Sequence, residues 1–169
     1  ETDLDGGKQI GISKIYVKDF SFESPKAPDV FRSGEWSPHT DLNLRSSHKA
    51  VEGDEKLHEV VLTITVEAKQ EEQTMFLAEV QQAGLFQIDG YSEEEFKAIV
   101  CSFCPNILFP YAREAIASTV QRGGFPEFVL QPINFDALYM QSVAEQAKAA
   151  GAETNGGDAN GSDSGAESS

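Results

Sequence analysis

Two predicted helices meet at the stretch Cys104-Pro105-Asn106-Ile107-Leu108-Phe109-Pro110-Tyr111-Ala112-Arg113-Glu114. Pro105 suits the first turn of a helix, where the amide hydrogen that proline lacks would have no partner. Pro110 follows within the same stretch, so either the regular helix starts there or its first turns are bent. We therefore expect a stiff corner between a helix that ends near Cys104 and one that continues to Arg122.

The second of these helices carries a broad apolar stripe. One row of the stripe recurs every four residues and a neighbouring row fills the adjacent positions, namely Leu108, Ala112, Ile116 and Val120 with Ile107, Tyr111 and Ala115. A stripe of this width predicts burial against a sheet and also against a second surface, such as another subunit.

The chain before these helices shows the period-two pattern of strands. Alternation of apolar and polar residues predicts strands at 10–23, 42–44, 57–69 and 74–88, the last two forming a long antiparallel hairpin. In the first strand apolar residues occur on both faces, which predicts a bulge or a partly covered second face. Because strands precede helices, we predict an α+β fold with a four-stranded antiparallel sheet and helices packed on one face.

Capping signals bound the helices. Ser92 and Glu95 form a capping box at the first helix start. Gly123 and Gly124 are expected to end the second helix, because glycine readily adopts the left-handed conformation. An extended segment follows that is more apolar than an ordinary loop, and Asn134 is expected to cap a last helix.

Composition sets the domain organisation and limits the partners. We predict a disordered N-terminus at 1–8, one domain at 9–149 and a disordered acidic tail at 150–169. The net charge of −15, from 28 acidic and 13 basic residues, disfavours nucleic acid and favours basic polypeptides as partners. No long apolar run and no signal-peptide pattern occurs, which predicts a cytoplasmic protein without membrane insertion.

Motifs for chemistry are few. Cys101 and Cys104 have the CxxC spacing, but they lie between two helical patterns rather than after a strand, and a zinc site would need two further ligands. We expect buried structural thiols. The sequence contains no Walker loop, GxGxxG, GxSxG or HExxH, so we predict no enzyme activity, cofactor or metal. An enzyme hypothesis would depend on the two cysteines.

Apolar residues occur in excess where a monomer would have few. They are Phe31 and Trp36 in one loop, Phe125, Phe128 and Leu130 in another, and Met75 and Leu77 on a strand face. This pattern predicts large subunit interfaces or a groove for apolar segments of other chains. A groove that tolerates many sequences is a property of chaperones.

Four separated motifs resemble SecB, the bacterial protein-export chaperone family. They are Ile15-Tyr16-Val17-Lys18-Asp19-Phe20-Ser21-Phe22-Glu23, Phe76-Leu77-Ala78-Glu79-Val80-Gln81-Gln82, Cys104 through Glu114, and Gly124-Phe125-Pro126 with Pro132-Ile133-Asn134-Phe135-Asp136-Ala137-Leu138. The resemblance covers about 9–147. It implies a homotetramer, built as a dimer of dimers, that holds unfolded precursor proteins in the cytoplasm without ATP and passes them to SecA, the motor of the Sec translocon.

The resemblance also implies three surfaces. A client groove is implied at Trp36, Leu42, Leu44, Phe125, Phe128, Leu130, Phe135 and Leu138. A SecA-docking face is implied at Asp19, Glu23, Leu77 and Glu79. The tetramer interface would use the helix at Ile107, Leu108, Tyr111, Ala112, Ala115 and Ile116. The alternative is a SecB-like chaperone dedicated to one client, such as an antitoxin, which sequence does not separate from a general export chaperone.

Overall fold

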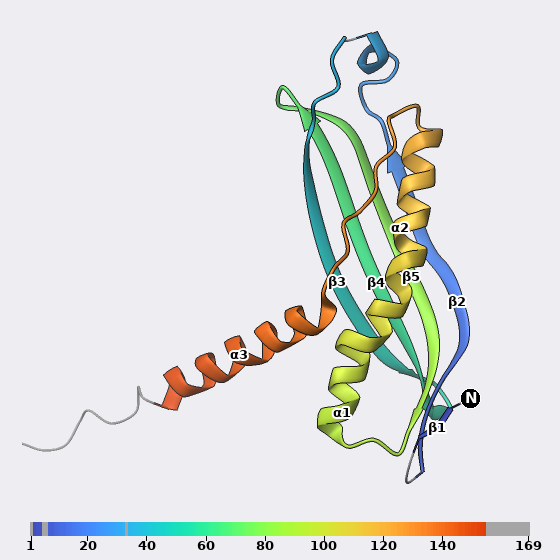
Figure 1. Ribbon diagram of the computed structural model, residues 1–169, viewed down its shortest axis with the longest axis vertical. Helices are drawn as coiled ribbons and strands as arrows, with labels where there is room; N and C mark the ends of the chain where they lie inside the picture. The colour runs from blue at the N-terminus through green and yellow to red at the C-terminus, as the bar shows by residue number, and fades with distance from the viewer. Residues whose placement is uncertain (1, 5–6, 33, 155–169) are drawn as a thin grey trace, which may run out of the picture.

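The computed structural model describes residues 2–4, 7–32 and 34–154. The elements in chain order are β1 (Thr2–Leu4), β2 (Lys8–Glu23), the 3-10 turn η1 (Asp29–Arg32), β3 (His39–Val51), β4 (Asp54–Gln70), β5 (Gln73–Asp89), α1 (Glu93–Ala98), the π-helical segment η2 (Ile99–Phe103), α2 (Cys104–Arg122) and α3 (Phe135–Thr154). Figure 1 shows a layer of long strands crossed on one face by α1 and α2, with α3 projecting from the body.

All strand pairs of the sheet are antiparallel, in the order β1-β2-β5-β4-β3. The predicted α+β architecture, with helices on one face of an antiparallel sheet, is confirmed. Its four long strands match the predicted four.

Three boundaries differ from the sequence prediction. β1 adds a short fifth strand inside the segment predicted to be disordered, because it pairs with the start of β2. β3 is longer than predicted, since backbone pairing with β4 continues through its polar half. α3 continues to Thr154, so the start of the predicted tail at 150–154 is helical. The predicted tail beyond it, 155–169, lies outside the described residues.

Two register shifts in β2 explain its mixed pattern. They lie between Ile12 and Lys14 and between Val17 and Asp19, so the predicted bulge is confirmed twice. Each shift moves the next residues to the opposite face. Tyr16 lies between the two shifts, and its side chain is therefore on the sheet face away from the helices. Before the first shift and after the second, the apolar side chains of β2 face the helices.

The predicted corner between two helices is replaced by a continuous helical run. Phe103 and Cys104 keep right-handed helical angles, with φ of −61° and −64°. The Cys104 amide donates to the carbonyl of Ile99, five residues back, which is the π-helical pattern. Pro105 lies in the first turn of α2 as predicted, and Pro110 lies inside the helix. Pro110 is exposed, so its missing amide hydrogen leaves a solvent-side carbonyl free to bind water.

The core forms where α2 crosses β4 and β5. One helix row, Leu108, Ala112, Ile116 and Val120, is 0% exposed, and the sheet contributes Val60, Leu62, Ile64, Val66, Phe76, Val80 and Phe86. Alternate residues of β4 and β5 and every fourth residue of α2 thus form one apolar layer.

The helix can approach the sheet closely because β5 carries a glycine beneath it. A Cβ atom on Gly84 would lie 2.7 Å from the Phe86 ring and 3.1 Å from a methyl of Leu108, both in fully buried side chains. We expect Gly84→Ala to lower the free energy of unfolding by about 1–3 kcal/mol, the usual range for overpacking a core.

Urea unfolding of the two glycine variants at one protein concentration tests this. Gly11→Ala is the matched control, because Gly11 also lies in a strand and a Cβ there has no neighbour within 4 Å. An equal loss of stability in both variants would contradict close packing at Gly84.

Candidate functional site

An aromatic cluster lies at the end of the body where β5 begins. The Phe125 ring lies 5.3 Å from the Trp36 ring, 5.4 Å from Phe31 and 5.2 Å from Phe76, measured between centroids. Phe128 contacts Phe76 at 6.3 Å. Phe76 and Phe125 are buried, whereas Trp36 and Phe31 are 37% and 51% exposed. The cluster therefore has a fixed inner wall and an open outer wall.

Two adjacent glycines allow the cluster to form. Gly124 adopts a left-handed φ of +88°, as predicted for the end of α2, and a Cβ there would lie 3.0 Å from the Phe31 ring. A Cβ on Gly123 would lie 2.4 Å from the Phe22 ring. Side chains at these positions would displace the aromatic rings as well as the turn.

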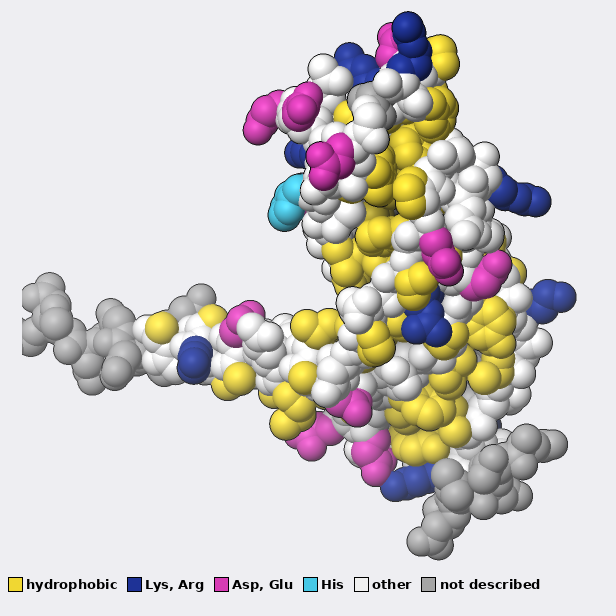
Figure 2. Space-filling model, turned by 45° about the horizontal axis from the view of Figure 1, so that its top comes forward, with side chains coloured by type: hydrophobic (Ala, Val, Ile, Leu, Met, Phe, Trp, Pro, Cys, Tyr) yellow, Lys and Arg dark blue, Asp and Glu magenta, His cyan; other side chains and the backbone are white. Residues whose placement is uncertain are grey.

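A second apolar surface is a cavity of about 690 Å³ between the body and α3. Its body wall includes Leu44, Leu62, Lys97 and Cys101, and its α3 wall includes Phe135, Leu138, Tyr139 and Val143. The extended segment 125–134 runs from the aromatic cluster to the root of α3 (Figure 1). Figure 2 shows hydrophobic side chains in a band along this side of the body.

The structure divides the predicted client residues between these two surfaces. Trp36, Phe125 and Phe128 lie in the aromatic cluster, and Leu44, Phe135 and Leu138 line the cavity. Leu42 is 46% exposed and faces the same side of β3 as Leu44, whereas Leu130 is buried.

Other residues of these surfaces were not assigned to the groove from sequence. Phe76 belongs to the regular pattern of the predicted strand at 74–88, so its position in the sequence does not mark it as part of a groove. Tyr139 and Val143 follow Phe135 at helical spacing, which places them on the same wall. Cys101 faces the cavity because of the π-helical segment, which a sequence pattern does not reveal.

The sheet face opposite the helices brings together the four predicted docking residues. In the register of β2 and β5, Asp19 pairs with Gln81, Ser21 with Glu79, and Glu23 with Leu77. All four predicted side chains therefore share one face on two adjacent strands. Glu79 also accepts a hydrogen bond of 2.8 Å from Thr65 on β4.

The same face carries a charged network that ties β2 to β4. The Tyr16 hydroxyl donates to Glu59, and the Lys18 ammonium lies 2.7 Å from the other oxygen of that carboxylate. Lys49 adds a contact at 3.8 Å. Hydrogen bonds from Lys18 and Tyr16 lower the pKa of Glu59, and burial together with the Glu59 contact raises the pKa of Tyr16 to about 12. These hydrogen bonds and ion pairs fix the side chains of Tyr16, Lys18 and Glu59 relative to one another, beside the acidic residues of the same face.

The helix residues predicted for a subunit interface separate into two groups. Leu108, Ala112 and Ile116 have no exposed area, because they pack on the sheet of their own chain, so their predicted interface role is corrected to a core role. Tyr111 is 51% exposed.

Ile107 and Ala115 are partly buried. Tyr111 and Ala115 border a hollow of about 450 Å³ shared with Ile15 and Val17 of β2.

The cysteines and histidines offer little chemistry. Cys101 and Cys104 are free thiols; Cys104 is buried as expected, whereas Cys101 is exposed, which corrects the expectation of two buried thiols. Burial raises the pKa of both, that of Cys104 to about 12, which disfavours the thiolate needed for nucleophilic or redox work. His48 and His58, which the sequence did not place together, both contact the Phe96 ring, at 5.8 and 4.7 Å. In the described part of the chain, no group of three metal-binding side chains occurs.

Of the helices in the described ranges, none is both long enough and apolar enough to span a membrane.

Comparison with known proteins identifies the family. A family model described as "Preprotein translocase subunit SecB" matches residues 4–146. A "Protein-export protein SecB" of Pseudomonas fluorescens is 53% identical over 137 residues, which cover 81% of this chain and 84% of that protein. The protein of the same name from Nitrosococcus oceani is 51% identical over 144 residues, which cover 85% of this chain and 86% of that protein.

A solved structure supports the fold. A SecB-like chaperone of Mycobacterium tuberculosis, in complex with a peptide from an antitoxin, superposes with a TM-score of 0.62 at 21% identity, covering 73% of this chain and 90% of that one. At this identity the similarity shows the fold alone. From the family match and the two close relatives, we conclude that the chain belongs to the SecB family of protein-export proteins.

Proposed function

We propose that this chain is an ATP-independent chaperone that binds unfolded precursor proteins in the cytoplasm and delivers them to SecA for export. The observation that carries the proposal is the pair of apolar surfaces, the aromatic cluster and the cavity. Both remain accessible on the helix side of this chain after it has folded. Family membership supports the export role.

Client capture follows from the hydrophobic effect. An unfolded polypeptide exposes apolar side chains that a folded protein buries, and each large side chain that leaves water contributes about 1.5–3 kcal/mol. A client that reaches both surfaces gains from linked binding events, and copies of the chain in one assembly would extend this gain. No nucleotide is needed, because release requires only a partner that competes for the client or for the chaperone.

The proposed SecA-docking face is the acidic end of the open sheet face. Asp19 and Glu23 are exposed there beside Leu77 and Glu79. Such a surface favours a partner with a basic patch and a small apolar contact. Because the client surfaces lie on the helix side of the sheet, one chain could hold a client and dock on the motor at the same time.

The proposed assembly is a dimer of dimers. Exposed apolar residues outside the client surfaces support it, namely Ile12, Val17 and Tyr111 on β2 and α2. Their neighbours Ile15, Ile107 and Ala115 are partly buried, so an interface there would use Tyr111 as its large anchor.

A chaperone dedicated to one client is the second candidate. The fold neighbour in complex with an antitoxin peptide favours it, whereas the close relatives carry the export name. A pull-down of newly made chains distinguishes the candidates, because a dedicated chaperone would retain one client and an export chaperone a range of secreted precursors.

We expect Leu44→Ala and Leu138→Ala each to weaken binding of an unfolded precursor about fivefold. Each variant removes apolar area worth about 1 kcal/mol from the cavity wall. Isothermal titration calorimetry with a precursor held unfolded would measure the change. Met140→Ala is the matched control, because Met140 lies exposed on α3 but does not line the cavity. Unchanged affinity in both cavity variants would place the client site elsewhere.

We expect Asp19→Lys combined with Glu23→Lys to weaken SecA binding about tenfold at low salt, because attraction to a basic partner becomes repulsion. Affinity for an unfolded client should stay the same. The control is Glu94→Lys, an exposed residue of α1 on the other side of the sheet. SecA affinities that are equal for all three proteins in a binding titration would refute this docking face.

Tyr111→Asp should shift the assembly from tetramer to smaller species, since it places a charge in the centre of the proposed helix interface. Sedimentation velocity at micromolar concentration measures the species present. Gln131→Asp adds the same charge at an exposed position of the extended segment 125–134 and should leave the distribution unchanged. A Tyr111→Asp protein that remains a tetramer would show that the interface does not use this face of α2.

A further inference from the structure

α3 contacts the body almost only at its root. From Asp136 to the residue at 152 every side chain is exposed except Tyr139, which is partly buried. Figure 1 shows the helix leaving the body at its first turn. A helix of this length extends about 30 Å, so a small change of angle at the root moves its far end by many ångströms. The contacts at the root therefore set its direction.

Among the described residues, the contacts at the root include a ring contact, a helix cap and a hydrogen bond between side chains. The buried rings of Phe109 and Phe135 meet at 5.8 Å. The side-chain oxygen of Asn134 caps the helix by accepting a 2.9 Å hydrogen bond from the Ala137 amide. The Ser102 hydroxyl donates a hydrogen bond to the Asp136 carboxylate. The ring contact is apolar packing within the core and the cap lies within α3 itself, so the Ser102–Asp136 bond is the polar, directional link to the body.

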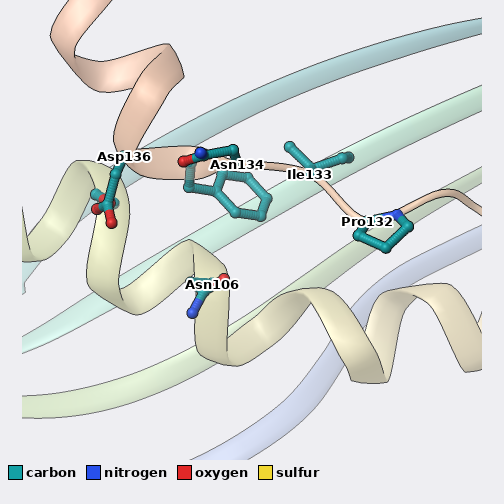
Figure 3. Close-up of a pocket in the computed structure, with 7 residues that line it drawn as sticks. Asn106, Pro132, Ile133, Asn134 and Asp136 are labelled. Carbon is teal, nitrogen blue, oxygen red and sulfur yellow. The ribbon is translucent and has the colours of Figure 1, made fainter.

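Ser102 lies in the π-helical segment η2 and is only 4% exposed. A buried hydroxyl without a partner is costly, and the Asp136 carboxylate supplies a partner for this one. A hollow of about 340 Å³ beside the bond gives this end of α3 room to tilt. Figure 3 shows this hollow, with Asn134 and Asp136 at the start of α3 and Asn106 on the neighbouring helix.

The direction of α3 also sets the width of the client cavity. Leu138, Tyr139 and Val143 form one wall of that cavity, and all three lie beyond the root. The opposite wall, at Leu44 and Leu62, belongs to the sheet and does not move with α3.

We propose that the Ser102–Asp136 hydrogen bond is a latch that fixes the angle of α3 and so the opening of the apolar cavity. Ser102 and Asp136 are positioning residues, because the bond acts through the α3 wall and not by contact with a client. The effect of the bond on the angle of α3 does not depend on the proposed function. Its consequence rests on that function, because the latch then sets how large a client segment the cavity admits.

The Cys101 thiol can be used to measure the angle between α3 and the body. Cys101 lines the cavity next to Ser102, whereas Cys104 has no exposed area. The rate at which iodoacetamide modifies Cys101 therefore measures how well α3 covers it, and Cys104 reports any general opening of the core. Mass spectrometry of the full chain assigns the modification to one thiol or the other.

We expect Ser102→Ala and Asp136→Ala each to raise the modification rate of Cys101 about two- to tenfold, the factor that the loss of one net hydrogen bond allows. The double variant should show no further increase, because both changes remove the same bond. Gln141→Ala is the control, since Gln141 is exposed on α3 outside the root, does not line the cavity, and bonds to Glu145 of the same helix. Cys104 should stay unmodified in every variant.

Unchanged Cys101 rates in both single variants would overturn the latch. A modification rate of Cys104 that rises together with that of Cys101 would also overturn the latch, because the bond would then contribute only to the stability of the core. Adding an unfolded precursor to the parent protein separates the two proposals. Protection of Cys101 by the precursor tests client binding in the cavity, whereas the rates without precursor test the latch alone.

Discussion

The packing of α2 on β4 and β5 is the constraint on which the other surfaces depend. A single row of side chains, from Leu108 to Val120, is wholly buried on the helix side of the sheet. The sheet accepts the helix because β5 carries Gly84 where a larger residue would meet Leu108. Once α2 is seated, the opposite face of the sheet faces solvent, and the outer side of α2 does as well.

The chain therefore separates its proposed tasks by surface. The aromatic cluster and the cavity lie on the helix side, bordered by the extended segment that follows α2. The acidic residues of β2 and β5 lie on the opposite face, beside the ordered network of Tyr16, Lys18 and Glu59. Spatial separation of this kind is suited to a carrier, because a bound client does not block a face that a second partner could use.

The continuous helical run from α1 to α2 gives the proposed client cavity one of its walls. In η2 the backbone stays helical in the π-helical pattern, with the Cys104 amide bonded five residues back, which accommodates the nearby Pro105 without a break. That local change places Cys101 at the cavity and buries Ser102 under the root of α3. The two CxxC cysteines consequently differ in environment, one exposed to the cavity and the other enclosed in the core.

Sequence by itself determined the kinds and order of the elements, because they follow from local periodicity and caps. The β4–β5 hairpin, the capping box at Ser92 and Glu95, the left-handed Gly124 and the Asn134 cap are all as predicted. It also selected the residues of the candidate surfaces, through the resemblance to a family and the apolar excess in two loops. These signals are local in the chain.

Tertiary structure alone decided which face each residue uses. The width of an apolar stripe on a helix does not show how much of the stripe one sheet will cover. Leu108, Ala112 and Ile116 were therefore expected at an interface, but they lie in the core. Whether Pro105 breaks or bends a helix depends on what packs around it, and here the backbone remains helical. The bond between Ser102 and Asp136 joins residues 34 positions apart. Contacts over such separations arise only when the sheet and helices bring distant segments together, which local periodicity does not encode.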